Sequence, residues 1–337
     1  MNIKCLIPAA GKGTRMRPLT HSLPKAMLPV AGKPAIFHII DSVKETGITD
    51  FVIITGYLYE LMESEILNNY PELKIEFVRQ TQQKGLGHAC YMAKDKFENN
   101  EGLLIIYGDT LFDANLKEII ESKNIVIGVC EVEDPRRFGV VELDENKKKI
   151  INLIEKPKNP PTNLAIPGIN YFPNSRLLFD ALENIIKNNI KTKNEYQITD
   201  AFSHIVKNNI SDINPYIIDN WYDVGTLDEM LNTNKLLLIK NETENLGIIE
   251  NSKIIDPVYI EKGAIIKNSS IGPCASIAAN VQVINSNISS SIIDINSEIT
   301  SARIQNSIIG RNSKIKEING KIIVGDDCVI ENKNNST

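Results

Sequence analysis

The stretch IPAAGKGTRMRP, residues 7–18, follows directly on the apolar run 3–7, which is predicted to form the first β-strand. A turn of small and glycine residues at the end of such a strand lets backbone N–H groups approach a phosphate closely. Arg15, Arg17 and Lys25 add positive charge to this part of the chain. The stretch therefore predicts a phosphate-binding loop at the carboxyl end of a strand.

Two common phosphate loops do not fit this stretch. A P-loop requires Gly-x-x-x-x-Gly-Lys-Ser/Thr, and that spacing is absent here. The dinucleotide fingerprint Gly-x-Gly-x-x-Gly begins well with Gly11 and Gly13 but meets Met16 at its third position. A methionine is too large for the close packing of helix on strand that glycine permits there. We therefore expect the loop to serve a different nucleotide chemistry.

A longer motif surrounds the loop and continues to Pro29. It consists of Gly11-x-Gly13-Thr14-Arg15-Met16-x-Pro18, followed by Pro24-Lys25-x-x-Leu28-Pro29. This motif resembles the signature of sugar-1-phosphate nucleotidylyltransferases, the enzymes that make NDP-sugars. The resemblance implies catalytic roles for Arg15, which would grip the triphosphate, and Lys25, which would lie near the α-phosphate. It also implies nucleotide binding by Ala9, Ala10, Gly11, Gly13 and Thr14.

Length, charge and cysteine usage limit the class of protein. A chain of 337 residues can hold two domains and a substantial core. A net charge of −5 without a basic block argues against nucleic acid or an anionic membrane as partner. No membrane span or signal peptide is expected. The cysteines are widely spread and never form Cys-x-x-Cys, which favours small buried hydrophobes in a reducing cytoplasm over disulfides or zinc: Cys5, Cys90, Cys130, Cys274 and Cys328.

The first part of the chain alternates short apolar runs with amphipathic segments. This alternation predicts an α/β fold with a doubly wound, mostly parallel, Rossmann-like sheet in a catalytic domain of residues 1–241. Ligands of such sheets bind at the carboxyl ends of the strands. The expected strands are 3–7, 51–55, 75–80, 103–107 and 125–131. The expected helices include 35–46, 87–97 and a connecting helix at 226–241.

Residues 246–332 follow a different pattern, with an aliphatic residue every five or six positions. The spaced residues are Ile248, Ile254, Ile260, Ile266, Ile271, Ile277, Val283 and Ile288. This period resembles the hexapeptide repeat of a left-handed parallel β-helix, whereas a low-complexity tail would lack such regularity. Acyltransferases with this repeat commonly use a histidine base, but the histidines all precede the repeats: His21, His38, His88 and His204. We therefore interpret the repeats as a scaffold for oligomerisation or regulation.

Two aspartates are candidate metal ligands. Asp109 follows a predicted strand in Tyr-Gly-Asp-Thr, and Asp223 lies in Trp-Tyr-Asp-Val-Gly-Thr, which resembles the second metal-binding segment of the family. Carboxylates at the edge of a sheet can hold Mg²⁺, the cofactor that we expect. A carboxylate that caps the next turn is the structural alternative for Asp109.

Two further groups of residues are candidates for reading the base and the sugar. Gln80 and Gly85 lie in a loop that resembles the base-reading loop, because a side-chain amide presents both a donor and an acceptor. The neighbouring Gln82 and Gln83 remain alternatives. Sugar-phosphate binding is implied by the resemblance of Phe-Gly-Val-Val, Glu-Lys-Pro and two later segments to the family pattern: Gly139, Glu155, Lys156, Asn170 and Glu195.

The resemblance implies transfer of a nucleotidyl group from UTP or dTTP to a sugar-1-phosphate, with glucose-1-phosphate as first candidate. The substrates are then a nucleoside triphosphate and a sugar-1-phosphate, and a cytoplasmic homo-oligomer is expected. Three alternatives remain open. They are a mannose- or heptose-1-phosphate guanylyltransferase that uses GTP, a bifunctional uridylyltransferase/acetyltransferase, and a non-catalytic scaffold subunit that binds sugar nucleotides.

Overall fold

A computed structural model describes residues 2–98, 100–241 and 245–332, which fold into two compact units. The first unit holds residues 2–11 and 36–222. The second combines residues 12–35 with the chain from residue 223 onward. The predicted division into 1–241 and 246–332 follows the order of the sequence and not these units, and it stays a prediction.

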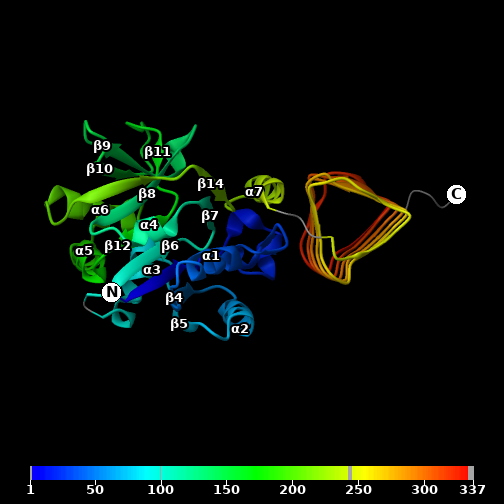
Figure 1. The fold of residues 1–337 in the computed structure, drawn as a ribbon, viewed down its shortest axis with the longest axis horizontal. Helices are drawn as coiled ribbons and strands as arrows, with labels where there is room; N and C mark the ends of the chain where they lie inside the picture. Colours follow the sequence, from blue (N-terminus) through cyan, green and yellow to red (C-terminus); the bar gives the residue numbers. More distant parts are fainter. Residues whose placement is uncertain (1, 99, 242–244, 333–337) are drawn as a thin grey trace. The chain divides into compact units, whose positions relative to one another are not determined.

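A ten-stranded mixed sheet forms the centre of the first unit, in the order β10-β9-β11-β8-β12-β6-β1-β4-β5 with β13 paired to β8 (Figure 1). The neighbours β6, β1, β4 and β5 are parallel, as predicted for a doubly wound α/β sheet, whereas β12 runs antiparallel between β6 and β8. The five predicted strands are confirmed to within one residue at each end. The strands are β1 (Ile3–Pro8), β4 (Asp50–Thr55), β5 (Lys74–Arg79), β6 (Gly102–Ile106), β8 (Ile125–Glu131), β9 (Gly139–Leu143), β10 (Ile150–Glu155), β11 (Leu164–Ala165), β12 (Ile169–Phe172) and β13 (Ile213–Ile217).

Helices connect these strands. They are α1 (Ala35–Lys44), α2 (Tyr59–Asn69), α3 (Leu86–Met92), α4 (Leu116–Ile120), α5 (Ser175–Lys187) and α6 (Ile198–Lys207), with the 3-10 helices η4 (Lys94–Lys96) and η5 (Pro135–Arg137). The longest of these six α-helices, α5, begins where the Asn174 side chain accepts a hydrogen bond from the Arg176 N–H. Such an N-cap satisfies a donor that the first turn leaves unpaired. The predicted helix 87–97 is divided between α3 and η4.

The second unit contains short elements near the N-terminus and the connecting helix. The short elements are the 3-10 helices η1 (Thr14–Met16), η2 (Leu19–His21) and η3 (Lys25–Met27), and the hairpin of β2 (Pro29–Val30) and β3 (Lys33–Pro34). The connecting helix α7 (Leu227–Lys240) occurs where it was predicted. In the first unit, β7 (Thr110–Asp113) pairs with β14 (Asn220–Asp223), which ends at the first residue of the second unit, in a separate two-stranded sheet.

Residues 248–331 form three parallel sheets that are the sides of a triangular prism, the left-handed β-helix that the repeat predicts (Figure 1). One side consists of β15 (Ile248–Glu250), β18 (Ile265–Lys267), β21 (Gln282–Ile284), β24 (Glu298–Thr300), β27 (Lys314–Lys316) and β30 (Val329–Glu331). The second consists of β16 (Lys253–Ile254), β19 (Ser270–Ile271), β22 (Asn287–Ser289), β25 (Arg303–Gln305) and β28 (Asn319–Gly320). The third consists of β17 (Val258–Ile260), β20 (Ala275–Ile277), β23 (Ile292–Ile293), β26 (Ile308–Ile309) and β29 (Ile323–Val324).

The spaced aliphatic residues fill the interior of the prism, with one exception in the first coil. The residues from Ile260 to Ile288 in the predicted series are at most 1% exposed. Ile248, however, is 55% exposed and pairs with Ile265, whereas its neighbour Ile249 aligns with the buried Ile266. The prediction of Ile248 as an interior residue is therefore wrong by one position. The six-residue period alone does not define the register at the end of the stack, because β15 has a neighbouring coil on one side only.

Asparagines at the corners explain the polar composition of the repeats. Asn280, Asn296 and Asn312 have left-handed φ angles of 58°, 58° and 56°. Asparagine adopts this conformation more readily than most other residues, since its short polar side chain can hydrogen-bond locally. Here the amide of Asn280 donates to that of Asn296 at 3.2 Å, and Asn296 donates to Asn312 at 3.1 Å. Each coil is thus joined to the next at its corner.

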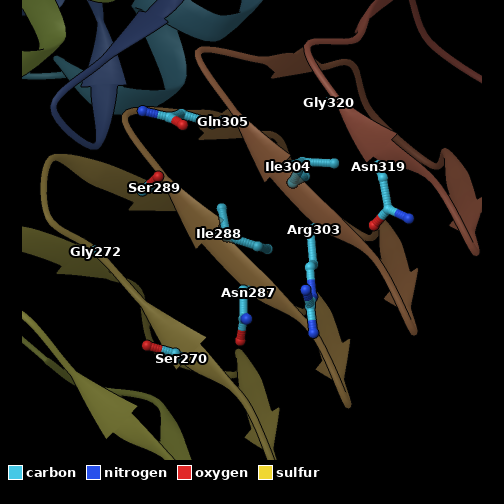
Figure 2. Close-up of a pocket in the computed structure, with 10 residues that line it drawn as sticks. All are labelled: Ser270, Gly272, Asn287, Ile288, Ser289, Arg303, Ile304, Gln305, Asn319 and Gly320. Atoms are coloured by element: carbon cyan, nitrogen blue, oxygen red, sulfur yellow. The ribbon is translucent and has the colours of Figure 1, made fainter.

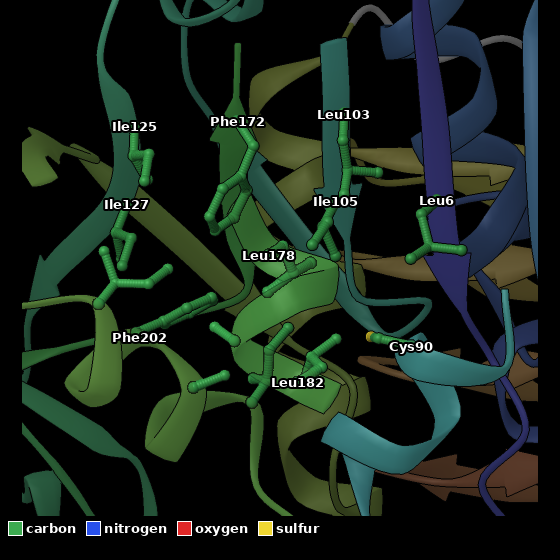
Figure 3. Close-up of a cluster of buried hydrophobic side chains, with 14 of the residues drawn as sticks. Leu6, Cys90, Leu103, Ile105, Ile125, Ile127, Phe172, Leu178, Leu182 and Phe202 are labelled. Atoms are coloured by element: carbon green, nitrogen blue, oxygen red, sulfur yellow. The ribbon is translucent and has the colours of Figure 1, made fainter. Parts of the chain in front are cut away.

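The mixed sheet packs one of its hydrophobic faces on α3, α5 and α6 (Figure 3). Leu178 and Leu182 of α5 and Phe202 of α6 lie under the sheet. Four of the five cysteines are buried as predicted, and burial raises the pKa of Cys90 to about 12; Cys328 is half-buried, so the prediction is wrong for it. Within the described residues, no helix has the length and apolar character that crossing a membrane requires.

Candidate active site

The turn after β1 lies beside two glycines, Gly56 after β4 and Gly108 after β6. The Ala9 N–H donates to the Ile54 carbonyl at 2.9 Å. A Cβ on Gly56 would lie 2.7 Å from the Ala10 carbonyl oxygen, and one on Gly108 would lie 2.8 Å from the Ala9 Cβ. Both glycines are therefore needed for this close approach. At Gly11 a Cβ would meet nothing within 4 Å, so the space beside the backbone is open there.

The continuation of this turn, in the second unit, is packed around Gly13. Gly13 has a left-handed φ of 60°, and a Cβ on it would lie 2.9 Å from the Cβ of Lys25. The Thr20 hydroxyl donates to the Gly13 carbonyl at 2.8 Å. Met16, the residue that breaks the dinucleotide fingerprint, is fully buried and anchors the loop, whereas Arg15 is exposed. The structure thus places Lys25 directly beside Gly13.

In the predicted base loop, Gly85 allows two distant segments to meet. Gly85 has a φ of 106°, and a Cβ on it would lie 2.5 Å from the Tyr196 carbonyl oxygen. This gives Gly85 a structural reason besides the expected approach of a base. Gln80 follows β5 and is half-buried. The glutamine whose amide reaches the phosphate-loop backbone is Gln83, which donates to the Ala10 carbonyl at 3.4 Å.

On the predicted sugar side, Gly139 and Glu155 lie opposite each other on β9 and β10. The Thr199 hydroxyl donates to Glu155 Oε2 at 2.8 Å, and Lys156 Nζ lies 3.0 Å from Glu155 Oε1. A Cβ on Gly139 would lie 3.2 Å from Glu155 Oε2, so a glycine keeps room for this carboxylate. The side chain of Glu155 is 7% exposed, whereas that of Lys156 is 38% exposed. The structure therefore brings these predicted residues together around one buried carboxylate.

Two further predicted sugar-side residues make no hydrogen bond to that carboxylate among the described residues. Asn170 is fully buried on β12, paired with Ile105 and Ile127, and its amide has no hydrogen-bond partner among the described residues. Glu195 Oε2 instead accepts a hydrogen bond from Gln197 Nε2 at 3.0 Å. Their roles in binding the sugar phosphate stay predictions.

Burial changes the proton affinity of two other groups in the first unit. The pKa of Tyr107 is raised well above its usual value, chiefly by burial. Burial also raises the pKa of Asp200, although the hydrogen bond from Thr192 to its Oδ1 at 3.0 Å opposes this effect. Both groups therefore favour the neutral form more than they would in water.

The two predicted metal ligands lie in different units, and each is held by its own turn. Asp109 lies between Tyr107 and Thr110, whose N–H donates to the Tyr107 carbonyl at 3.0 Å. Asp223 precedes Gly225, where a Cβ would lie 2.8 Å from Asp223 Oδ2. In the described residues, no group of three or more His, Cys, Asp or Glu side chains is arranged to hold a metal ion. Two carboxylates nevertheless suit Mg²⁺, which characteristically completes its shell with phosphate oxygens and water.

Sequence reasoning missed Gly56 and Thr199 and assigned no contact to Gln83. Gly56 follows β4 directly, so its place after a parallel strand was an available signal. Thr199 lies at the start of α6, and its contact with Glu155 spans 44 residues, which no local pattern reveals. These contacts depend on the topology of the sheet.

The outer face of the β-helix carries a second candidate, a polar groove of about 510 Å³ (Figure 2). Ser270, Asn287, Arg303 and Asn319 line it from equivalent positions of successive coils. Its described lining contains amides, hydroxyls and one guanidinium, with neither histidine nor carboxylate. This groove therefore offers no acid–base pair.

Comparison with known proteins identifies the family. The family model described as "Nucleotidyl transferase" matches residues 4–239, a range that includes every predicted site residue. The chain belongs to this family. The predicted resemblance to sugar-1-phosphate nucleotidyltransferases is therefore confirmed, and the substrates in this family are a nucleoside triphosphate and a sugar-1-phosphate.

The relatives of this nucleotidyl transferase differ in how much of the chain they match. It is 35% identical over 339 residues to the bifunctional protein GlmU of Methanocaldococcus jannaschii, with 96% of this chain and 78% of that protein covered. It is 27% identical to a glucose-1-phosphate thymidylyltransferase of Streptomyces griseus, with 93% of each chain covered. The solved structure of a UDP-glucose pyrophosphorylase complexed with UDP-glucose matches with a TM-score of 0.61 and 27% identity, over 72% of this chain and 100% of that one.

Proposed function

We propose that this protein transfers a nucleotidyl group from UTP or dTTP to a sugar-1-phosphate, with glucose-1-phosphate as the first candidate, and releases pyrophosphate. The observation that carries the proposal is the packing of the Lys25 stem beside Gly13, which joins a cation to a glycine-rich backbone turn. A lysine and backbone N–H groups in such a turn are the ordinary means of binding the phosphates of a nucleotide.

The reaction needs charge stabilisation more than it needs a base. A sugar-phosphate oxygen attacks the α-phosphorus, the bond from that phosphorus to the bridging oxygen breaks, and pyrophosphate leaves with the electron pair. The second pKa of a phosphate monoester is about 6, so the nucleophile is largely ionised at neutral pH. Arg15 and Lys25 would hold the triphosphate in line for attack and offset the charge that develops. Backbone N–H groups from Ala10 to Thr14 would bind the remaining phosphate oxygens, and Ala9, whose N–H donates to the Ile54 carbonyl, would line the loop beside them.

Asp109 and Asp223 are the proposed ligands of Mg²⁺. Their carboxylate oxygens match the preference of this ion. When bound, Mg²⁺ would reduce the repulsion between the two anionic substrates.

The base and sugar would be read by the groups of the first unit. We assign the edge of the pyrimidine to Gln80 and Gln83, whose amides can donate and accept, beside Gly85. Buried Glu155 would accept hydrogen bonds from sugar hydroxyls, and the more exposed Lys156 would bind the sugar phosphate. Gly139, Asn170 and Glu195 would complete this side.

The choice of glucose-1-phosphate is supported by two relatives, the Streptomyces griseus thymidylyltransferase and the UDP-glucose pyrophosphorylase. The relatives described as bifunctional GlmU proteins favour a test of other sugars. A homo-oligomer is supported by apolar side chains exposed at the ends of the β-helix, Ile248 and Val329.

Pyrophosphate release tests the proposal. Purified protein with Mg²⁺ is mixed with UTP, dTTP, GTP, CTP or ATP and with glucose-, N-acetylglucosamine-, galactose- or mannose-1-phosphate in all pairs. We expect release with UTP or dTTP and glucose-1-phosphate. Lys25→Ala should remove it, whereas Arg176→Ala, which changes an exposed cation paired with Asp180 on α5, should not.

Two outcomes would contradict the proposal. Release only with GTP and mannose-1-phosphate would indicate the guanylyltransferase alternative. No release with any pair would indicate the non-catalytic scaffold subunit, and binding of NDP-sugars by calorimetry would then identify its ligand.

A further inference from the structure

Helix α7 carries two adjacent polar residues in its buried face. Thr233 is 1% exposed and Asn234 is 0% exposed. A buried hydroxyl or amide is costly unless it is hydrogen-bonded, so the partners of these side chains show what holds them there.

Asn234 joins three segments of the second unit. Its Oδ1 accepts a hydrogen bond from the Ala31 N–H at 2.8 Å and another from the Ser276 hydroxyl at 2.7 Å. Its Nδ2 donates to the Cys274 carbonyl at 3.5 Å. Ala31 is at the tip of the β2–β3 hairpin, and Ser276 belongs to β20 of the β-helix. One amide therefore connects the hairpin, α7 and the β-helix.

The hairpin and the loop before it also lie against the β-helix directly. Gly32 has a φ of 92°, and a Cβ on it would lie 2.5 Å from the ring of Tyr259, so no side chain fits between them. A Cβ on Gly325 would lie 3.3 Å from the Pro18 carbonyl oxygen. The segment that carries Arg15 and Lys25 is thus packed on the β-helix at two places besides Asn234.

Thr233 contacts the segment that carries the proposed metal ligand Asp223. Its hydroxyl donates to the Asp223 carbonyl at 2.7 Å. Thr233 therefore holds the backbone of Asp223, and the next residue, Asn234, holds the β2–β3 hairpin. This hairpin begins two residues after η3, the 3-10 helix that contains Lys25.

We propose that Thr233 and Asn234 are positioning residues, which set the placement of Asp223 and Lys25 and connect it to the first coils of the β-helix. This inference rests on the proposed function of Lys25 and Asp223. Replacing Asn234 by alanine leaves the Ala31 N–H and the Ser276 hydroxyl without a partner in a buried place, so the hairpin is expected to move away. The β-helix is in this view a support for the nucleotide loop.

The test compares four variants in steady-state kinetics and hydrogen–deuterium exchange. Asn234→Ala and Thr233→Val each remove one support, whereas Thr233→Ser keeps the hydroxyl. Ser286→Ala is the matched control, because Ser286 is 2% exposed and its hydroxyl donates to the Ile284 carbonyl and accepts from the Ala302 N–H within the β-helix. All four are measured for Tm, for KM of each substrate with the best pair, and for exchange in residues 14–34.

We expect Asn234→Ala and Thr233→Val to raise KM for the nucleotide about tenfold, the size of effect that one lost buried hydrogen bond produces. KM for the sugar-1-phosphate should stay within about twofold, and Thr233→Ser should restore the nucleotide KM. Exchange in residues 14–34 should rise in Asn234→Ala. Ser286→Ala should lower Tm by a similar amount with both KM values unchanged.

If Asn234→Ala and Thr233→Val lower Tm but leave the nucleotide KM of an active enzyme unchanged, the two residues are only structural and the proposal is wrong. A rise in KM in Ser286→Ala as well would also overturn it, because general destabilisation would then explain the effect. If the wild type releases no pyrophosphate with any pair, the proposed function has failed, and the positioning role fails with it.

Discussion

Left-handed backbone is held in different ways at two glycines of the first unit and at the corner asparagines of the β-helix. In the first unit Gly85 and Gly168 have φ angles of 106° and 119° and are pressed against Tyr196 and Tyr107, residues distant in sequence. In the β-helix the same region of φ is occupied by corner asparagines that bond to each other from coil to coil.

The two kinds of position differ in whether neighbouring residues repeat the same contact. Gly85 and Gly168 each permit one particular close approach to a distant segment. Each corner asparagine is one of a series, so its neighbours keep the coil in register when it is lost. Single substitutions should therefore have large effects near the predicted site and small effects in the repeats.

The largest effect is expected at the proposed metal ligands. Asp109→Ala or Asp223→Ala should lower kcat roughly 10³-fold or more, since the charge of the triphosphate would lose its main compensation. Pyrophosphate release measures this, and an unchanged Tm would show that the fold is intact. Asp228→Ala, which removes an exposed carboxylate of α7 that is paired with Lys321 of the β-helix, is the control and should keep kcat. Normal kinetics in either ligand variant would contradict the metal assignment.

Gly85→Ala should have the next largest effect, a loss of about 3 kcal/mol in the free energy of unfolding. The new Cβ would overlap the Tyr196 carbonyl oxygen and also impose left-handed strain. Urea denaturation measures the loss. Gly47→Ala separates the two causes, because Gly47 has a φ of 90° with nothing within 4 Å, so it should cost only about 1 kcal/mol. Equal losses in both variants would show that the close approach is unimportant.

Asp294 is an exception to the redundancy of the β-helix, because burial raises its pKa to about 6. The folded state then binds a proton that the unfolded state has released, so stability is fully present below about pH 4 and decreases as pH rises to about 6. Arg311 opposes this shift, while Asp326 and Glu261 add to it.

Asp294→Asn should remove this pH dependence, because the amide oxygen can still accept from the Ile295 N–H. At pH 7.5 the variant should be more stable than the wild type by about 1–2 kcal/mol. At pH 4 the two proteins should be equal. Thermal melts across this range measure the difference, and parallel curves would contradict the assignment.

The smallest loss of stability is expected at a corner asparagine of the β-helix. Asn296→Ala should cost about 1 kcal/mol, from left-handed strain and two exposed side-chain hydrogen bonds. Asn296→Gly should keep most of the stability, since glycine adopts this conformation without strain. Urea denaturation of both variants measures this, and a loss above about 3 kcal/mol would show that the corners are not redundant.

Local patterns were sufficient for much of the fold. The strand at residues 125–131 was predicted with its observed ends, and α7 was predicted within one residue of each end, because apolar runs and caps are read from neighbouring positions. The antiparallel insertion of β12 could not be read in this way. A short apolar strand looks the same in either direction, and its direction is decided by its partners.

The sequence by itself determined the family, the α/β class of the first part, the β-helix and the identity of the charged residues, since these depend on residue types at fixed spacings. The tertiary structure decided which residues meet: Lys25 beside Gly13, Thr199 on Glu155, and Asn234 between Ala31 and Ser276. Such contacts join positions that are far apart in the chain. Their formation depends on the packing of whole elements, because a buried polar group is stable only where the fold brings it a partner.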